Sequence, residues 1–331
     1  MFNPVIILGA GASKDYSQYG NPAPVTDELL HSDFKNSLAL NQYKEAADLL
    51  TQISYSVLNK QKSFEEALSD IKNDFGALSH VKSQFVALEF YLQQVFQKIS
   101  LNIQELNNYK TLVQKIKNFN QGKACVVTFN YDTLFESSIE MDFWQTMESY
   151  IKNNLKLIKV HGSHDWAYIQ HKSLISGYIL DRYPSDYDFY TKNPDYLDNI
   201  RSSQKDINPY PMAYINKQKD HNDFIKFPAI AIPLPTKSIF ICPQAHLREL
   251  ELALSTADRV LIVGWKAGDK PFLDFMKEHL SKGVSITVVS SSKKSAEEII
   301  SNKLSDFLCR AASNGGFSAF VNSDDIRQFF V

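Results

Sequence analysis

The most informative segment of the sequence is Val126-Val127-Thr128-Phe129-Asn130-Tyr131-Asp132. Two apolar β-branched residues lead into Thr128, and an Asn, an aromatic residue and an Asp then arrive together. A buried strand of a parallel sheet has this pattern, because its carboxyl end is where polar side chains reach a ligand. We therefore expect a ligand site at the end of this strand.

The composition is typical of a soluble globular protein. The 331 residues can bury a large core and allow one large domain or two smaller ones. A formal net charge of −2 gives no reason to expect nucleic acid or an acidic membrane surface as a partner. No apolar run approaches the ~20 residues that span a bilayer, and the start lacks a basic signal region. We therefore expect a cytoplasmic protein.

The three cysteines are scattered along the chain. Cys125, Cys242 and Cys309 form no CxxC pair, so the sequence supports neither a disulfide framework nor a ribbon-type zinc site. Buried structural thiols in a reducing compartment are the simplest reading, and no metal is expected.

A second strand end lies near the N-terminus. The apolar residues 5–8 run directly into Gly9-Ala10-Gly11-Ala12-Ser13. Glycines after a buried strand let the backbone approach a pyrophosphate, and the amides that follow point at its negative charge. The full GxGxxG fingerprint is absent because position 14 is Lys. A plain tight turn explains GxG alone about as well.

Residues 27–121 are predicted to form a large all-helical insertion. Ser63 and Glu66 fit a capping box, and apolar residues then repeat at helical spacing. A dinucleotide fold places its second strand after a single helix, with an acidic residue ~20 positions beyond the glycines. That spacing fails here, so we expect this block to serve as scaffold or as a surface for self-association. The loop at 14–26 is read equally as a connector or as a flap over a ligand.

The rest of the chain alternates strands and helices around a second insertion. We expect a strand at 155–160 that ends in a polar loop, His161 to Trp166, and an irregular insertion with little regular structure at 168–227. Strands are expected at 259–263, 285–289 and 317–321, and helices at 133–150, 245–257, 271–282 and 295–312.

Polar or glycine-rich loops thus follow five predicted strands. They are residues 9–13, 128–132, 161–166, 264–269 and 290–292. If the strands are parallel, all five loops lie along one edge of the sheet, which suits a dinucleotide better than a mononucleotide. The predicted fold class is α/β with a Rossmann-like parallel sheet, as a single domain over 1–331 whose α/β part comprises 1–26 and 122–331.

Four of these loops resemble the ordered motifs of the sirtuin (SIR2) superfamily. More closely, they resemble the SIR2-like NAD-hydrolysing effectors of bacterial anti-phage systems. The motifs are Gly-Ala-Gly-Ala-Ser at 9–13, Thr-Phe-Asn-Tyr-Asp at 128–132, Lys-Val-His-Gly-Ser at 159–163 and Val-Gly-Trp-Lys-Ala-Gly-Asp at 263–269. The resemblance covers 1–25, 122–170 and 228–331. It implies a SIR2-type fold, NAD+ as the substrate, and cleavage to nicotinamide and ADP-ribose that depletes cellular NAD+ in abortive infection.

The resemblance also implies roles for individual residues. Asn130 would contact the nicotinamide ribose and help place the attacking water, and His161 would be the base. Asp132 would hold the nicotinamide carboxamide. Gly9, Ala10, Gly11 and Ser13 would bind the phosphates, and Gly264, Asp269 and Ser290 would lie near the adenosine half.

Two departures separate this chain from deacetylating sirtuins. Those enzymes have Gln where this chain has Phe129, and they carry a four-cysteine zinc module. Residues 168–227, where that module would fall, contain no cysteine. Protein deacylation is therefore disfavoured relative to simple hydrolysis of NAD+.

Other readings of these residues stay open. Asn130 and Asp132 could form a turn and a helix cap, since such side chains favour those positions. His161 could be a satisfied structural histidine, and Trp166 and Trp265 are read as packing residues. The protein could also be a sensor that binds NAD or ADP-ribose without cleaving it. The resemblance further suggests a homo-oligomer and a separate activating partner, such as a HerA-like ATPase or an Argonaute-type protein.

Overall fold

The structure is a computed structural model. It describes residues 2–16, 26–30, 41–101, 105, 107–139, 145–175, 180–197, 208–218, 221–234, 240–313 and 315–331. Most of the loop predicted at 14–26 lies outside these residues, so its reading as connector or flap stays a prediction.

The chain divides into two compact units. Unit 1 comprises Met1–Ala23, Ile99–His161 and Gln244–Val331, and unit 2 comprises Pro24–Lys98 and Gly162–Pro243. The boundary passes through the predicted helical insertion, because residues 99–121 belong to unit 1. The assignment of 1–331 to a single domain stays a prediction.

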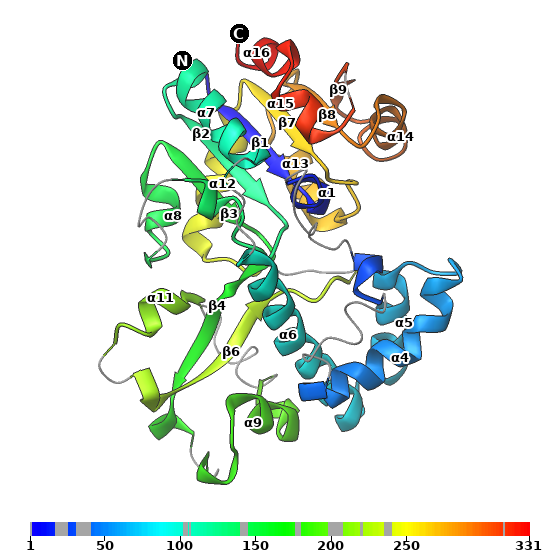
Figure 1. Cartoon of the computed structure of the whole chain (residues 1–331), viewed down its shortest axis with the longest axis vertical. Helices are drawn as coiled ribbons and strands as arrows, with labels where there is room; N and C mark the ends of the chain where they lie inside the picture. Colours follow the sequence, from blue (N-terminus) through cyan, green and yellow to red (C-terminus); the bar gives the residue numbers. More distant parts are fainter. Residues whose placement is uncertain are drawn as a thin grey trace. The chain divides into compact units, whose positions relative to one another are not determined.

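Unit 1 is built on a six-stranded sheet (Figure 1). The strand order is β3-β2-β1-β7-β8-β9, and every neighbouring pair is parallel. From β1 the chain first builds outward to β3 and then returns to build β7, β8 and β9 on the other side, which is the order of a doubly wound sheet. The predicted α/β fold with a Rossmann-like parallel sheet is therefore confirmed. The strands are β1 (Pro4–Leu8), β2 (Ala124–Thr128), β3 (Leu155–Lys159), β7 (Arg259–Val263), β8 (Ser285–Val289) and β9 (Leu308–Ala311).

The central strands are continuous apolar runs because both of their faces are buried. Every residue of β1 and β2 is buried, as is usual for a parallel sheet covered by helices on both sides. Among the helices, α7 packs against α15 and α16, and α12 packs against β2, β3 and α13. The helices of unit 1 are α1 (Ala10–Lys14), α7 (Asn108–Asn120), α8 (Ser149–Lys152), α12 (Gln244–Ser255), α13 (Lys270–His279), α14 (Lys293–Lys303), α15 (Phe317–Val321) and α16 (Asp324–Phe330), with a 3-10 turn η2 (Glu136–Ser138).

Unit 2 contains helices and a small antiparallel sheet in the order β5-β4-β6. An aromatic cluster forms part of its core, with Phe90, Phe189, Tyr190 and Phe227 in edge-to-face or tilted contact. The strands are β4 (Gly162–His171), β5 (Tyr210–Pro211) and β6 (Phe224–Ile230). The described helices are α4 (Lys44–Leu58), α5 (Phe64–Phe75), α6 (Ser79–Ser100, whose last two residues belong to unit 1), α9 (Asp186–Lys192) and α11 (Met212–Ile215). The described 3-10 turns are η1 (Thr26–Leu30), η4 (Lys172–Leu174), η5 (Leu180–Arg182) and η6 (His221–Asp223).

The helical character predicted for 27–121 is confirmed over the described residues. The predicted capping box opens α5: Glu66 N–H donates to Ser63 Oγ at 3.2 Å, and Ser63 N–H donates to the Glu66 carboxylate at 2.8 Å. Among the helices that the structure describes, none is long and apolar enough to cross a membrane.

Three assignments in unit 1 were wrong. The helix expected at 133–150 is, in its described part, a set of turns with only η2 and the start of α8. The helix expected at 295–312 ends at Lys303, and residues 308–311 form β9 because the exposed edge of β8 accepts one more parallel strand. The strand expected at 317–321 is helix α15, since a short apolar run does not distinguish a strand from a helix.

Two assignments in unit 2 were also wrong. The loop expected at 161–166 is only a turn at His161, because β4 begins at Gly162. The insertion at 168–227 is more regular than expected, since its described part holds most of the three-stranded sheet and α9. Residues 167–171 of β4 pair one after another with β6, and the register is irregular between Gly162 and Ala167.

Candidate functional site

The predicted loops do follow strands that end at one edge of the sheet. Leu8 lies opposite both Thr128 and Val263 in the parallel register. Thr128 in turn lies opposite Lys159, and Val263 lies opposite Val289. The strand order reverses between β1 and β7, and in open α/β sheets this is where ligands bind, beyond the carboxyl ends. The residues that follow β1, β2, β3 and β7 therefore define the candidate site.

The glycines after β1 and β7 let two loops touch. Gly9 N–H donates to Val263 O and Gly11 N–H donates to Gly264 O, both at 2.9 Å. Gly264 has φ of +62°, and a Cβ placed on it would lie 2.3 Å from the Ala12 amide nitrogen. This contact between loops by itself requires glycine. The phosphate contacts expected of Gly9, Ala10 and Gly11 stay a prediction.

Asn130 is buried at the end of β2 and its amide group is oriented by three oxygens. Its Nδ2 donates to Ser13 Oγ at 2.9 Å, to Gly9 O at 3.1 Å and to Tyr109 OH at 3.3 Å. A carbonyl oxygen can only accept, so Gly9 fixes which way the amide faces. The opposite atom, Oδ1, is buried and has no hydrogen-bond partner among the described residues. Leaving such an oxygen unpaired costs about 1–3 kcal/mol.

The hydroxyl of Ser13 hydrogen-bonds within the protein, and the phosphate contact expected of this residue stays a prediction. The residue is 1% exposed, and its Oγ contacts Asn130 Nδ2 and lies 2.8 Å from Tyr109 OH. The hydrogen bonds of the Ser13 hydroxyl therefore help to hold the Asn130 amide in place.

Asp132 shapes the turn after β2. Its Oδ1 accepts from Leu134 N–H at 3.1 Å, and its backbone carbonyl accepts from Lys159 Nζ at 2.5 Å. Lys159 is fully buried at the end of β3 and forms an ion pair with Glu136 at 2.7 Å. This ion pair could not be predicted from the sequence, because a lysine in a strand is usually solvent-exposed.

His161 pairs with Asp269, although 108 positions separate them. Its Nε2 lies 2.8 Å from Asp269 Oδ2, and the two side chains are only 10% and 11% exposed. Asp269 also caps α13, since its Oδ1 accepts from Phe272 N–H at 2.9 Å. A carboxylate accepts the Nε2–H of a neutral imidazole and thereby places the ring's lone pair on Nδ1. The structure places Asp269 against His161, and its predicted position near the adenosine half stays a prediction.

Aromatic rings surround His161 and tie it to the Asn130 loop. The centroid of the imidazole lies 5.0 Å from the ring centroid of Phe129 and 6.4 Å from that of Tyr131. Phe129 and Tyr131 are the two neighbours of Asn130 in the chain. Phe129 stacks on Trp265 with centroids 4.9 Å apart and planes 10° apart, and Phe272 packs edge-on against both. Trp265 is 7% exposed and is a packing residue, as expected.

Ser290, the last predicted site residue, lies after β8, where its Oγ hydrogen-bonds with Ser295 Oγ at 3.1 Å at the start of α14. Of the ten predicted residues, those joined by hydrogen bonds form three groups: Gly9, Ser13 and Asn130; Gly11 and Gly264; and His161 and Asp269.

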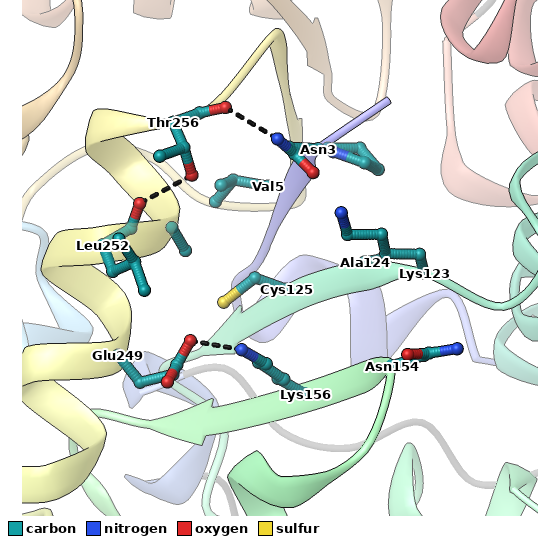
Figure 2. A pocket seen from close by; sticks show the side chains of 12 residues that line it. Asn3, Val5, Lys123, Ala124, Cys125, Asn154, Lys156, Glu249, Leu252 and Thr256 are labelled. Atoms are coloured by element: carbon teal, nitrogen blue, oxygen red, sulfur yellow. Dashed lines mark hydrogen bonds and ion pairs between the residues drawn. The ribbon is translucent and has the colours of Figure 1, made fainter. Parts of the chain in front are cut away.

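A pocket of about 250 Å³ lies at the other edge of the same sheet, and Figure 2 shows its lining. It is bordered by the amino ends of β1, β2 and β3 and by α12, with an ion pair between Lys156 and Glu249 on one side. Burial raises the pKa of the Cys125 thiol in its wall to about 12, so this thiol stays protonated. None of the predicted site residues lines this pocket.

Comparisons with known proteins give similarity at the level of structure alone. No family model matches the sequence, and no curated protein does. A structure described as Sir2 with a deacetylated p53 peptide and 3'-O-acetyl ADP-ribose aligns over 99% of this chain and 94% of that chain, with 12% identity and a TM-score of 0.44. A mutant of Sir2 homologues with 2'-O-acetyl ADP-ribose aligns over 98% and 91%, with 11% identity and a TM-score of 0.46. These TM-scores are below 0.5, and the similarity carries no argument about function.

Proposed function

We propose that this protein is an NAD+ glycohydrolase, which cleaves NAD+ into nicotinamide and ADP-ribose. The observation that carries the proposal is the buried, unpaired Oδ1 of Asn130 in a loop whose flanking rings contact the His161–Asp269 pair. A hydrogen-bond acceptor and a supported base at one edge of a doubly wound sheet suit a reaction at a nucleotide sugar.

The reaction needs positioning more than strong acid catalysis. Nicotinamide leaves as a neutral molecule from a cationic pyridinium, so the bond to C1′ breaks through an oxocarbenium-like state. In our proposal Asn130 Oδ1 accepts a hydrogen bond from a ribose hydroxyl or from the attacking water. This contact removes the penalty of the unpaired oxygen and fixes the reacting group in place.

His161 accepts the proton in this proposal. The oxygen of water bonds to C1′, the electrons of the C–N bond pass to nicotinamide, and the water proton moves to His161 Nδ1. Asp269 holds Nε2–H, which keeps Nδ1 as the acceptor and stabilises the imidazolium that forms.

The remaining contacts to NAD+ are proposed from the layout of the loops. Gly9, Ala10 and Gly11 would lie along the pyrophosphate, Gly264 and Ser290 near the adenosine half, and Asp132 near the carboxamide. The layout supports this because β1 and β7, which flank the switch point, supply the two glycine loops.

We further propose that the hydrolase acts in anti-phage defence as an abortive-infection effector. Unchecked loss of NAD+ would kill the host cell, so such an enzyme must be inactive until a trigger arrives. A homo-oligomer and a separate activator, such as a HerA-like ATPase or an Argonaute-type protein, would supply this control. Survival of a bacterial culture and its NAD+ content after phage infection, with wild-type protein or Asn130→Ala, test this role.

The activity is tested with purified protein, alone and with the protein encoded by its genomic neighbour. NAD+ is added and both nicotinamide and ADP-ribose are followed by chromatography. Turnover that Asn130→Ala and His161→Ala abolish, and that exposed His80→Ala retains, supports the hydrolase. Binding of NAD+ without turnover under every activating condition would favour a sensor, and turnover that requires an acylated peptide would favour a deacylase.

A further inference from the structure

The hydroxyl of Tyr109 meets the same two groups that hold Asn130. It lies 2.8 Å from Ser13 Oγ and accepts from Asn130 Nδ2 at 3.3 Å. Asn130 Nδ2 has two hydrogens for three oxygen neighbours. Ser13 and Tyr109 are hydrogen-bonded to each other as well as facing the amide, so the three side chains form one closed network.

Tyr109 itself has little freedom to move. It is 1% exposed, and its ring packs against Tyr16, Phe135 and Phe317, each with centroids 5.6 Å away. Because the ring is held on several sides, the position of the hydroxyl is set before any ligand arrives.

The start of α7 is anchored to the elements that carry Ser13 and Asn130. Asn108 N–H donates to Tyr16 O at 3.0 Å, just after α1, and the Asn108 side-chain amide donates to Asp15 O. On the other side, Ser138 Oγ donates to Asn107 Oδ1 at 3.1 Å, and Ser138 ends the turn η2 in the segment that follows Asn130. The first residues of α7 thus join the loops after β1 and β2.

We propose that Tyr109 is a positioning residue of the candidate site, which fixes the Asn130 amide so that Oδ1 faces the substrate. This inference rests on the proposed function. It also changes the view of the helical insertion, which the sequence suggested was scaffold, because α7 belongs to that insertion. Burial and the nearby charge of Asp132 raise the pKa of Tyr109, so the hydroxyl keeps its proton at ordinary pH.

Tyr109→Phe removes the hydroxyl and keeps the ring, and Tyr91→Phe is its matched control. Tyr91 is also fully buried, but its hydroxyl has no hydrogen-bond partner among the described residues. We expect Tyr109→Phe to lower kcat about 10-fold and to change KM less than about 2-fold, because it loosens the placement of a reacting group without removing a binding contact. Ser13→Ala breaks the same network and should act in the same direction. Tyr91→Phe should leave both constants unchanged.

A second readout does not depend on turnover. The side-chain amide resonance of Asn130, assigned by its absence in Asn130→Ala, should shift in Tyr109→Phe and stay in place in Tyr91→Phe. An active wild type with unchanged kcat in folded Tyr109→Phe overturns the positioning role and leaves the proposed function intact. A wild type inactive under every condition overturns the proposed function, and the amide resonance then decides the network: an unchanged resonance in Tyr109→Phe would refute it.

Discussion

The two edges of the six-stranded sheet differ: the amino edge contains a cavity, and the carboxyl edge contains the candidate functional site. The amino edge has the pocket, whose lining includes an ion pair between Lys156 and Glu249 and hydrogen bonds from Asn3 to Thr256 O and to Asp258. The carboxyl edge has a buried amide oxygen without a partner and a histidine fixed by a carboxylate. Unsatisfied hydrogen-bonding groups and oriented bases indicate chemistry more directly than open volume does.

The largest expected effect compares one residue from each edge. His161→Ala removes the base and should lower kcat roughly 10²–10⁴-fold. Cys125→Ala, in the wall of the amino-edge pocket, should leave kcat within about 2-fold of the wild type, because a protonated thiol far along the strand takes no part in the reaction. Steady-state release of nicotinamide measures both. Equal losses of kcat in the two variants would contradict the assignment of the reaction to the carboxyl edge.

The same strand offers a matched pair of lysines. Lys159, at the carboxyl end of β3, is fully buried with Glu136, whereas Lys156, near the amino end, forms a partly exposed pair with Glu249. Lys159→Met should lower the free energy of unfolding by about 3–5 kcal/mol, because it strands a buried carboxylate. Lys156→Met should lower it by about 0–1 kcal/mol. Urea denaturation measures both, and similar losses would show that burial does not distinguish the pairs.

Asp269→Asn isolates the carboxylate that faces His161. An Asn side chain can still accept from Phe272 N–H and cap α13, so stability should change little. We expect kcat to fall between about 10- and 100-fold, a part of what a general base contributes. Thermal melting provides the control for folding. Full activity in a stable Asp269→Asn protein would assign Asp269 to the helix cap alone.

The smallest expected effect concerns His246, which lies on the helix that borders the amino-edge pocket. It is fully buried, and its Nε2–H donates to Met147 O at 2.8 Å. Burial lowers its pKa below the ordinary 6.5, so the unfolded chain takes up a proton near that pH while the folded protein does not. This contribution to stability is present above pH 6.5 and is lost as the pH falls below it.

His246→Gln keeps a donor for Met147 and removes the titration. Between pH 7.5 and pH 5.5, the wild-type Tm should fall further than the Tm of His246→Gln. Parallel melting curves for the two proteins would contradict the assigned direction of the pKa shift.

The sequence predicted the sheet better than it predicted the contacts within the site. Buried parallel strands are continuous β-branched runs, so β1, β2 and β7 could be recognised one by one and placed at a common edge. The His161–Asp269 and Lys159–Glu136 pairs left no local pattern, because their members come from different elements. The sequence did not single out Tyr109, since its role depends on a hydroxyl whose partners lie on α1 and after β2.

The central claim is tested most directly by the products that the purified protein, with its activating partner, forms from NAD+. The account predicts equal amounts of nicotinamide and ADP-ribose from the wild type, and neither product from Asn130→Ala with the same fold by circular dichroism. Equal turnover by the wild type and Asn130→Ala, or tight binding of NAD+ with no nicotinamide released under any activating condition, would contradict it.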